Sequence, residues 1–442
     1  MNGIADKVPL KLKLKCERMQ IRQQINNHKS LVESFFSLSI LNGLNVLLPL
    51  ITLPYILRVV GASNYGVYAF VYALVQYVSL VNTYGFNFSA TKQASQCRKE
   101  KDQLNKIYNA VIACRLILSV CAVILFLSLS PWLLETRDKM LMFWMGLGII
   151  LGDTFIPVWL FQGVEKMRYL TIINVVSKLI FTLLIFIIIR EAKDYIYIIL
   201  LNGLGYIVAG ICSTIIAKKM FGLDFSKPSW SDIKFQFKDG LAVFGSNIGM
   251  NLYRNTNIFI LKFFVSDAAV GIYASAEKII KGLQMAVSPI AQALFPHLSY
   301  KFKTQPLKES IDLLLRVSKR FFVLLLIITV GTFIGADLLT KLFCGNGFAD
   351  AVSLIRIMSL VILFGGMNYI LGILGLINLN EGKSFFYAVM VSGIASILFL
   401  FLFASKYGNF AAAWALTLSE ILLFALCIFK IYKLKRQKHE SV

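Results

Sequence analysis

Polar side chains recur at helical spacing inside two segments of the chain that are otherwise apolar. On the first segment, Asn247, Asn251 and Arg254 stand at positions i, i+4 and i+7, which share one face of a helix. On the second, Glu277 and Lys281 begin a similar stripe. Ionisable groups are costly in apolar surroundings and normally face a protein interior or a wet cavity. The spacing therefore predicts two polar helix faces around one cavity, with hydrogen bonding between packed helices as the alternative for the amides.

Two earlier apolar segments carry polar faces of the same kind. Their members are Asn42, Asn45 and Thr52 on one segment and Gln76, Ser79 and Thr83 on the next. We expect all four faces to converge on the same cavity.

The chemistry that these faces suit is the binding of an anion. The guanidinium of Arg254 has no acidic neighbour one turn away and is suited to bidentate contact with a phosphate. Lys281 follows Glu277 by four residues, so an intrahelical ion pair is the alternative for that lysine. Gly148-x-x-x-Gly152, by contrast, predicts only a close contact between helices.

Six basic and three acidic residues stand inside apolar segments, which leaves an excess of three positive charges there. The basic residues are Arg115, Lys178, Arg254, Lys278, Lys281 and Arg356, and the acidic residues are Asp153, Glu277 and Glu420. Arg115 and Arg356 lie near segment ends, where we expect them to extend toward the membrane surface. Lys178 lies in the middle of its segment, where the sequence leaves its role open.

The composition identifies the elements that must position these residues. The chain is 57% hydrophobic and 15% charged, with a mean hydropathy of +0.71, whereas a soluble protein carries about 25% charged residues. The net charge of +22 does not indicate a nucleic-acid partner, because the basic residues form short clusters between apolar runs. Twelve runs are long enough to cross a bilayer as helices. They cover approximately residues 34–57, 66–88, 108–131, 140–162, 169–189, 195–217, 240–262, 270–298, 316–336, 350–378, 385–404 and 408–429.

The distribution of lysine and arginine predicts the orientation of these spans. The two termini and the even-numbered connections carry 31 basic residues, and the opposite side carries 8. Positive charge stays cytoplasmic during insertion, so we expect both termini in the cytoplasm.

One segment recurs in the two halves of the chain. Ile56-Leu57-Arg58 is followed by Gly66-Val67-Tyr68-Ala69, and Ile260-Leu261-Lys262 is followed by Gly271-Ile272-Tyr273-Ala274, at offsets of 204 and 205 residues. Six spans in each half insert the same way round, so we expect two parallel lobes with substrate between them. The predicted divisions are a basic tail (1–33), an N-lobe (34–217), a cytoplasmic linker (218–239), a C-lobe (240–429) and a second tail (430–442).

Several kinds of site are not indicated by the sequence. The three histidines are scattered, which predicts no metal cluster, and Gly382-Lys383-Ser384 lacks the leading glycine of a phosphate-binding loop. The longest predicted outer loop, 337–349, is too short for a catalytic domain. These observations favour a carrier without a bound cofactor over an enzyme.

Two stretches resemble the polysaccharide flippases of the Wzx type. They are Leu53-Pro54-Tyr55-Ile56-Leu57-Arg58-Val59-Val60-Gly61 with Tyr65-Gly66-Val67-Tyr68, and Pro157-Val158-Trp159-Leu160-Phe161-Gln162-Gly163-Val164-Glu165-Lys166-Met167. The length and the repeat are similar to the superfamily shared with multidrug (MATE) exporters and the lipid II flippase. The resemblance therefore implies an all-α polytopic membrane protein with a MATE-like arrangement of two six-helix lobes.

The resemblance also implies a function. It implies a flippase of the bacterial inner membrane that moves an undecaprenyl-diphosphate-linked oligosaccharide by alternating access, coupled to a proton or sodium gradient. Membrane lipids and proteins of polysaccharide polymerisation and assembly are the partners it implies. At Gln162, Gly163 and Glu165 we expect a role in gating or folding rather than in sugar recognition.

Residue roles follow from combining this resemblance with the excess of positive charge. We expect Arg254, Lys278 and Lys281 to receive the diphosphate, with Lys178 as a further substrate contact. We expect Asn247 and Asn251 to contact sugar hydroxyls. Asp153, Glu277 and Glu420 are the candidates for ion coupling.

Two other classes of protein stay open at this point. A drug or cation antiporter is favoured if the basic residues inside the spans prove to be paired or turned away from the cavity. A membrane scaffold or enzyme that transports nothing is the third alternative, and an open central cavity argues against it.

Overall fold

The computed structural model describes residues 10–98, 100–285, 298 and 301–437. Within these ranges, the side chains of 10–42, 44–47, 242–243, 245–255, 346 and 437 are not described. The described residues form helices and no strands, as predicted. The long helices are α1 (Leu10–Thr83), α3 (Lys101–Leu133), α4 (Arg137–Thr154), α6 (Met167–Ile188), α7 (Tyr195–Phe221), α8 (Trp230–Leu261), α9 (Asp267–Met285), α11 (Leu307–Ile334), α13 (Ala351–Asn368), α14 (Gly382–Tyr407) and α15 (Asn409–Gln437). The short elements are α2 (Phe86–Gln96), α5 (Val158–Gly163), α12 (Ala336–Phe343), the π-helix η3 (Tyr369–Ile377) and the 3-10 turns η1 (Ala192–Asp194) and η2 (Asn346–Phe348).

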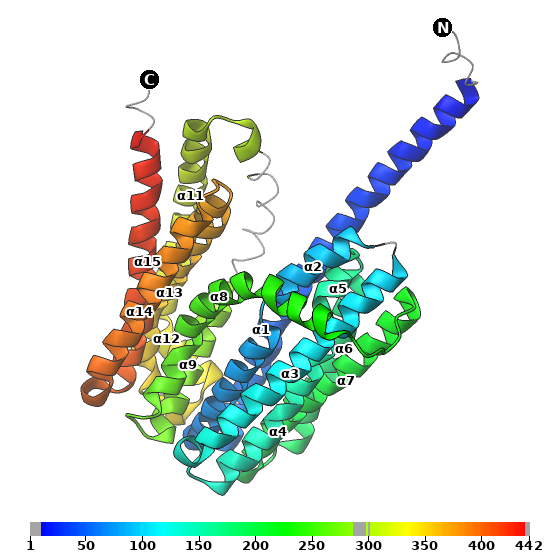
Figure 1. The fold of residues 1–442 in the computed structure, drawn as a ribbon. Coiled ribbons are helices and arrows are strands. Elements are labelled where there is room, and N and C mark those ends of the chain that lie inside the picture. Colours follow the sequence, from blue (N-terminus) through cyan, green and yellow to red (C-terminus); the bar gives the residue numbers. More distant parts are fainter. Residues whose placement is uncertain (1–9, 99, 286–297, 299–300, 438–442) are drawn as a thin grey trace.

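The helices form two bundles (Figure 1). One contains α3, α4, α6 and α7, and the other contains α11, α13, α14 and α15. The bundles approach each other at the lower end of Figure 1 and diverge at the upper end, where α1 begins and α15 ends. Helices α1 and α9 pack against each other between them.

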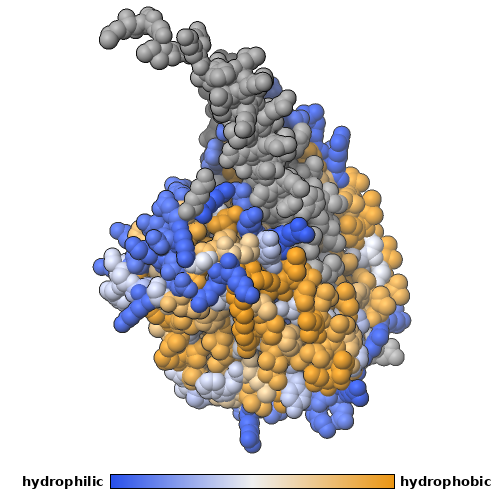
Figure 2. Space-filling view, turned by 90° about the vertical axis from the view of Figure 1, so that its right-hand side faces the viewer, coloured by the Kyte–Doolittle hydropathy of each residue, from blue (hydrophilic) through white to orange (hydrophobic). Residues whose placement is uncertain are grey.

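The surface carries the apolar belt of a membrane protein. Figure 2 shows a broad hydrophobic zone with hydrophilic residues gathered above and below it. Large apolar side chains such as Ile124, Leu183 and Ile327 are more than half exposed. Water does not tolerate so large an exposed apolar area, whereas lipid tails do. The chain is therefore an all-α polytopic membrane protein.

Helix length and composition, taken over the described residues, identify fewer spans than the twelve predicted. Within the described part of the chain, eight helical stretches are long and apolar enough to cross a membrane, or nine if α11 and α12, which meet at 71°, form one span. One of the eight, Leu48–Gln96, has 49 residues and would be about 70 Å long if straight, which is twice the thickness of the hydrocarbon core. It contains a break at Gly61, where φ is 74°, between the predicted first and second spans. The count of twelve stays a prediction.

Three predicted boundaries differ from the structure. The second span does not run unbroken to residue 88, because α1 ends at Thr83 and α2 begins after a break at Tyr84, whose φ is 47°. The fourth ends at Thr154, since Pro157 cannot continue the backbone ladder, and resumes as α5. The predicted linker is partly helical, because α8 starts at Trp230.

The recurring segment places two glycines against each other across the two halves. A Cβ built on Gly66 would lie 1.7 Å from the carbonyl oxygen of Asp267, and one built on Gly271 would lie 1.9 Å from that of Ala62. Gly66 and Gly271 are 205 positions apart in the sequence, and so are Ala62 and Asp267. The contact is thus reciprocal, as around a two-fold axis. We call these four residues the glycine contact.

Polar side chains reinforce the glycine contact on the side that the charge distribution predicts to be outside. The ammonium of Lys139, which is buried, lies 3.5 Å from the Asp267 carboxylate, and that of Lys262 lies 3.0 Å from it. Arg58 donates a hydrogen bond of 2.8 Å from Nη2 to the carbonyl oxygen of Leu342. The Lys139–Asp267 and Arg58–Leu342 contacts join the two halves at this end of the molecule, and Lys262 holds the Asp267 carboxylate from within the C-terminal half.

Candidate functional site

A cavity of about 460 Å³ lies between the two halves. Its walls come from α1, α6, α7 and α9, with Ile258 of α8. The predicted polar faces reach it through Thr52 and Gln76 on α1 and through Glu277 and Lys281 on α9. Three of the four predicted faces therefore meet at one cavity.

The cavity carries an excess of positive charge. Among its described lining residues, the ionisable groups other than tyrosines are Lys178, Lys278, Lys281 and Glu277. Three predicted substrate-binding lysines thus lie on the cavity wall, two from α9 and one from α6. An enclosed cationic site of this size suits an anionic head group.

Glu277 is buried and pairs with Lys281, whose Nζ lies 3.1 Å from Oε1. The predicted intrahelical pair is therefore present. Tyr273 donates to the same carboxylate oxygen at 3.4 Å and accepts a hydrogen bond from Asn257 at 3.2 Å. These contacts fix the Glu277 carboxylate at the edge of the cavity.

The other two lysines each lie over a tyrosine ring. Nζ of Lys278 is 5.9 Å from the ring centre of Tyr65, and Nζ of Lys178 is 5.1 Å from that of Tyr206. Lys278 forms no ion pair with any residue that the structure describes. An aromatic face stabilises a desolvated ammonium only partly, so the Lys278 charge stays available to an anion.

The repeat places related side-chain pairs on two helices that line the cavity, α1 and α9. On α9, Glu277 and Lys281 form the ion pair described above. The positions 205 residues earlier on α1 are Tyr72 and Gln76, which hydrogen-bond to each other through their side chains. Both pairs line the cavity. The same position in each half thus carries a neutral pair on one wall and a charged pair on the other.

Four tyrosines line the cavity and were missed by the sequence reasoning. Tyr65, Tyr68 and Tyr72 follow one another on α1 at i, i+3 and i+7, and Tyr206 comes from α7. The Tyr68 and Tyr72 rings stack with centres 5.6 Å apart. Tyrosines in an apolar helix resemble ordinary core residues. Their spacing leads into the predicted polar face that begins at Gln76, and this was the available signal.

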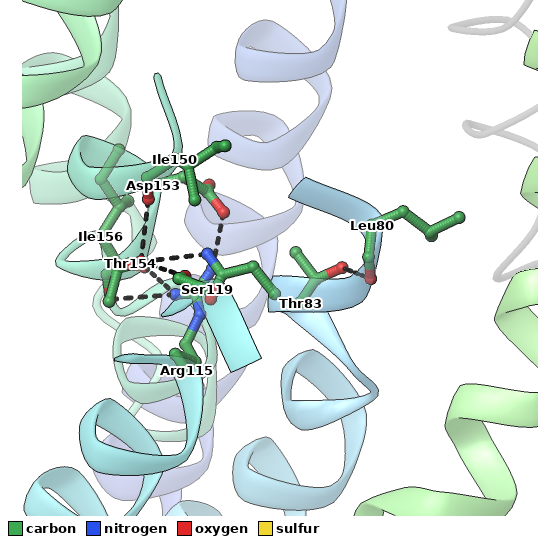
Figure 3. A network of polar contacts seen from close by, with 9 residues as sticks. Leu80, Thr83, Arg115, Ser119, Ile150, Asp153, Thr154 and Ile156 are labelled. Atoms are coloured by element: carbon green, nitrogen blue, oxygen red, sulfur yellow. Dashed lines mark hydrogen bonds and ion pairs between the residues drawn. The ribbon is translucent and has the colours of Figure 1, made fainter. Parts of the chain in front are cut away.

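Asp153 lies outside the cavity lining and belongs to a network within the N-terminal half (Figure 3). Arg115 Nη2 lies 2.7 Å from Asp153 Oδ2, and Nη1 donates to the carbonyl oxygens of Thr154 and Ile156 at 3.2 and 3.3 Å. Because the helix breaks before Pro157, these two carbonyl oxygens do not accept regular helical hydrogen bonds. The guanidinium of Arg115 donates to both of them instead. The expectation that Arg115 extends to the membrane surface is wrong, because its side chain is only 4% exposed.

Glu420 and Arg356 also lie away from the cavity lining. Glu420 is buried on α15, and Asn368 donates to its carboxylate at 2.7 Å. The three candidate coupling carboxylates, Asp153, Glu277 and Glu420, are therefore not brought together. Arg356 is exposed and lies over the ring of Phe333, as expected for a residue that extends toward the surface.

Arg254, Asn247 and Asn251 lie on α8, but their side chains are outside the described residues. Their proposed contacts stay predictions. Within the described part of the chain, no group of acidic, histidine or cysteine side chains is arranged to hold a metal ion.

The segment from Trp159 to Met167 packs rather than lines the cavity. Trp159 and Phe161 are fully buried, and a Cβ on Gly163 would lie 2.7 Å from the Cβ of Ala94 on α2. Glu165 adopts a φ of 59° and forms an ion pair with Arg98. These are the contacts of a packing motif at the α2–α5 corner.

Outside the spans, one carboxylate is held by two partners. Ser384 donates to Glu381 at 2.6 Å, and Lys430 lies 2.9 Å from the same oxygen. Both contacts hold the pKa of Glu381 below its ordinary value, and the hydrogen bond from Ser384 has the larger effect. The pair joins the start of α14 to α15.

Comparison with sequence families finds a match over residues 31–301 to the family described as polysaccharide biosynthesis protein. A protein of Escherichia coli K12, provisionally described as an O-antigen transporter, is 28% identical over 408 residues, which cover 91% of this chain and 97% of that protein. One of Shigella dysenteriae with the same description is 25% identical over 403 residues, covering 91% and 98%.

Two solved structures have the same fold. The lipid II flippase MurJ in an inward closed conformation gives a TM-score of 0.69 at 14% identity, covering 92% of this chain and 89% of that one. A multidrug resistance MATE family transporter of the MOP superfamily, in an inward-facing conformation, gives 0.66 at 16% identity, covering 88% and 96%. The predicted MATE-like fold is confirmed. The proteins compared are transporters and a flippase rather than enzymes.

Proposed function

The chain belongs to the polysaccharide biosynthesis protein family, and on that premise we propose that it moves a lipid-linked oligosaccharide across the bacterial inner membrane. The cationic cavity between the two halves is the observation that carries this proposal. A diphosphate joined to a polyprenol is an anion that must leave water to cross the bilayer. Lys178, Lys278 and Lys281 offer it ammonium groups in an enclosed site. The relatives associated with O-antigen transport support the same class of substrate.

Arg254 is a further proposed ligand of the diphosphate, and Asn247 and Asn251 are proposed contacts of the sugar. The helical spacing that puts all three on one face of α8 supports this assignment.

Alternating access is the proposed mechanism. The two halves touch at the glycine contact, at the end predicted to be outside, and diverge toward the other end (Figure 1). Substrate would enter from the cytoplasmic side, and parting of the glycine contact would open the opposite side.

Glu277 is the carboxylate we propose for coupling to a proton or sodium gradient. It lines the cavity and binds Lys281, so a diphosphate that takes Lys281 would leave Glu277 to accept a cation. Asp153 suits this role less well, because Arg115 already neutralises it. Glu420 stays a second proposed coupling residue. Replacing Glu277 with glutamine should remove the dependence of transport on the gradient while leaving substrate binding in place.

Transport by the purified protein in proteoliposomes tests the main proposal. We expect the double variant K178Q/K278Q to slow transbilayer movement of a polyprenyl-diphosphate-linked N-acetylhexosamine by about tenfold or more, since each lost charged contact costs about 1.5–3 kcal/mol. Lys193→Gln is the matched control, because Lys193 is 78% exposed and does not line the cavity. Equal rates for both variants would overturn the proposal.

The cationic-drug antiporter is disfavoured as the alternative. Its condition was that the basic residues inside the spans be paired or turned away. Arg115 and Lys281 are paired and Arg356 lies away from the cavity lining, but Lys178 and Lys278 line the cavity. Among the described lining residues, Glu277 is the one carboxylate that offers a cation an opposite charge, and Lys281 already binds it.

A further inference from the structure

The cavity has two chemically different walls. The wall from α9 carries Glu277, Lys278 and Lys281. The wall from α1 carries no charge among its described residues, and presents three tyrosines and Gln76. Helix α7 extends this neutral wall with Asn202 and Tyr206, which stand four residues apart. Lys178 of α6, whose Nζ lies 5.1 Å from the ring centre of Tyr206, also lines the cavity and is the one charge that α6 and α7 contribute among the described lining residues.

The hydroxyls of the neutral wall are open to a ligand. Tyr65 and Tyr68 are only 2% and 6% exposed, yet neither hydroxyl has a hydrogen-bond partner among the residues that the structure describes. The hydroxyl of Tyr206 is likewise without one. Tyrosine hydroxyls in a protein interior usually find a hydrogen-bond partner. None of these three oxygens is fully closed off, and Tyr206 is only partly buried, so a ligand in the cavity can supply that partner.

The neutral wall also offers acceptors and flat apolar faces. Asn202 uses its amide nitrogen to bind the carbonyl oxygen of Ile198 at 2.9 Å, which leaves the amide oxygen facing the cavity side without a described partner. The stacked rings of Tyr68 and Tyr72 present an aromatic edge and face beside it. Hydroxyl donors, amide acceptors and aromatic faces together suit a ligand that is uncharged, rich in hydroxyls and apolar on its ring faces. A pyranose has all three properties.

Packing holds this wall in place. Tyr206 is fixed because α7 lies directly against α4, where a Cβ on Gly152 would be 2.2 Å from the Tyr206 carbonyl carbon. The Tyr72 and Gln76 side chains hold each other. A preorganised wall loses little entropy when a ligand binds.

We propose that the tyrosine–amide wall (Tyr65, Tyr68, Tyr72, Gln76, Asn202 and Tyr206) is a saccharide subsite, separate from the anion subsite on α9. This inference rests on the proposed function and divides its site into two parts. The first sugar of the substrate lies against α1 and α7, and the diphosphate lies against Lys278 and Lys281. The division assigns contacts with the first sugar to α1 and α7, in addition to those proposed for Asn247 and Asn251 on α8, and recognition of the diphosphate mainly to α9.

Two lipid probes separate the subsites. One is a short-chain polyprenyl diphosphate, and the other is the same lipid carrying one N-acetylhexosamine. Binding of both to the purified full-length protein is measured by titration in detergent micelles. Tyr68→Phe and Tyr206→Phe remove one hydroxyl each and keep the ring, and Lys278→Gln removes one charge. Tyr197→Phe is the matched control, because Tyr197 lies on α7 but is exposed outside the cavity.

The proposal predicts a pattern across the probes. Each cavity Tyr→Phe variant should bind the glycosylated lipid about two- to tenfold more weakly, the range for one neutral hydrogen bond, and bind the bare diphosphate like the wild type. Lys278→Gln should weaken both probes alike. If the tyrosine variants weaken both probes equally, or neither, the saccharide subsite is refuted while the proposed function stands. If the wild type binds neither probe, the proposed function fails and the subsite with it.

Discussion

Replacing Gly271 with alanine is the perturbation whose effect the structure defines most sharply. The new Cβ would lie 1.9 Å from the carbonyl oxygen of Ala62 and 2.9 Å from the backbone nitrogen of Gly66. Both are backbone atoms, so no rotamer change relieves the clash. Ordinary contact begins at 3.4 Å, and α1 and α9 must therefore separate by about 1.5 Å at this point.

The cost falls on the arrangement in which the two halves touch. Overpacking of a tight contact costs about 1–3 kcal/mol. An alternative in which the halves are apart at this end is free of the clash. The balance between the two should thus move about 5- to 150-fold toward the separated arrangement.

The native Cys344 reports this balance. It is 1% exposed, two residues after Leu342, which accepts the hydrogen bond from Arg58. Burial also raises the pKa of the Cys344 thiol to about 11, so it is both inaccessible and protonated. In a variant whose other six cysteines are replaced, an impermeant maleimide added from outside should label Cys344 about 5- to 150-fold faster when Gly271→Ala is present.

Gly347→Ala is the matched control, because a Cβ there meets nothing within 4 Å although Gly347 is only three residues from Cys344. It should label at the wild-type rate. Wild-type labelling in folded Gly271→Ala would refute the view that the glycine contact holds this end closed. Equally fast labelling in both alanine variants would show that the effect is local to the loop.

Three further predictions follow from the charged groups. Arg115→Met should lower the thermal midpoint sharply, because it leaves the partly buried Asp153 carboxylate unpaired at a cost of about 3–5 kcal/mol. Adding Asp153→Leu should restore much of that loss. No recovery in the double variant would argue against a stabilising role for the ion pair. Glu277→Gln should tighten binding of a polyprenyl diphosphate several-fold, because Lys281 is then released to the anion, and unchanged or weaker binding in a titration would contradict this. Glu381, whose pKa is held below its ordinary value, contributes stability that is present above the ordinary carboxyl pKa and is lost as the pH falls through the lowered one. Glu381→Gln should therefore flatten the fall of the thermal midpoint with acid, and an unchanged slope would count against that contribution.

Periodicity and composition were sufficient to predict the fold class and much of the cavity. The apolar runs predict helices because the bilayer core offers backbone N–H and C=O groups no hydrogen-bond partners, and a helix satisfies these groups within the segment itself. The recurring Gly-x-Tyr-Ala segment predicted the repeat, and only the structure shows that its two glycines, Gly66 and Gly271, meet. The stripe on α9 predicted that Glu277 and Lys281 face a cavity, and both line it, because side chains on one helical face share one environment.

Features that depend on a second helix could not be predicted. Arg115 lies near a span end in sequence, and only the fold reveals that it binds Asp153 and the carbonyl oxygens of Thr154 and Ile156, at and just after the end of α4. The break at Tyr84 depends on a left-handed backbone conformation that a non-glycine residue rarely adopts. The tyrosines on α1 count as apolar in any hydropathy pattern, so their role emerges only when the unpartnered hydroxyls are seen around the cavity.

The central claim is that the cavity receives an anionic lipid-linked saccharide. The most direct test measures the wild-type protein in proteoliposomes with two substrates in parallel, a fluorescent polyprenyl-diphosphate-linked N-acetylhexosamine and a fluorescent organic cation. The cavity charge predicts protein-dependent movement of the diphosphate-linked lipid and none of the cation. Movement of the cation alone would contradict the account.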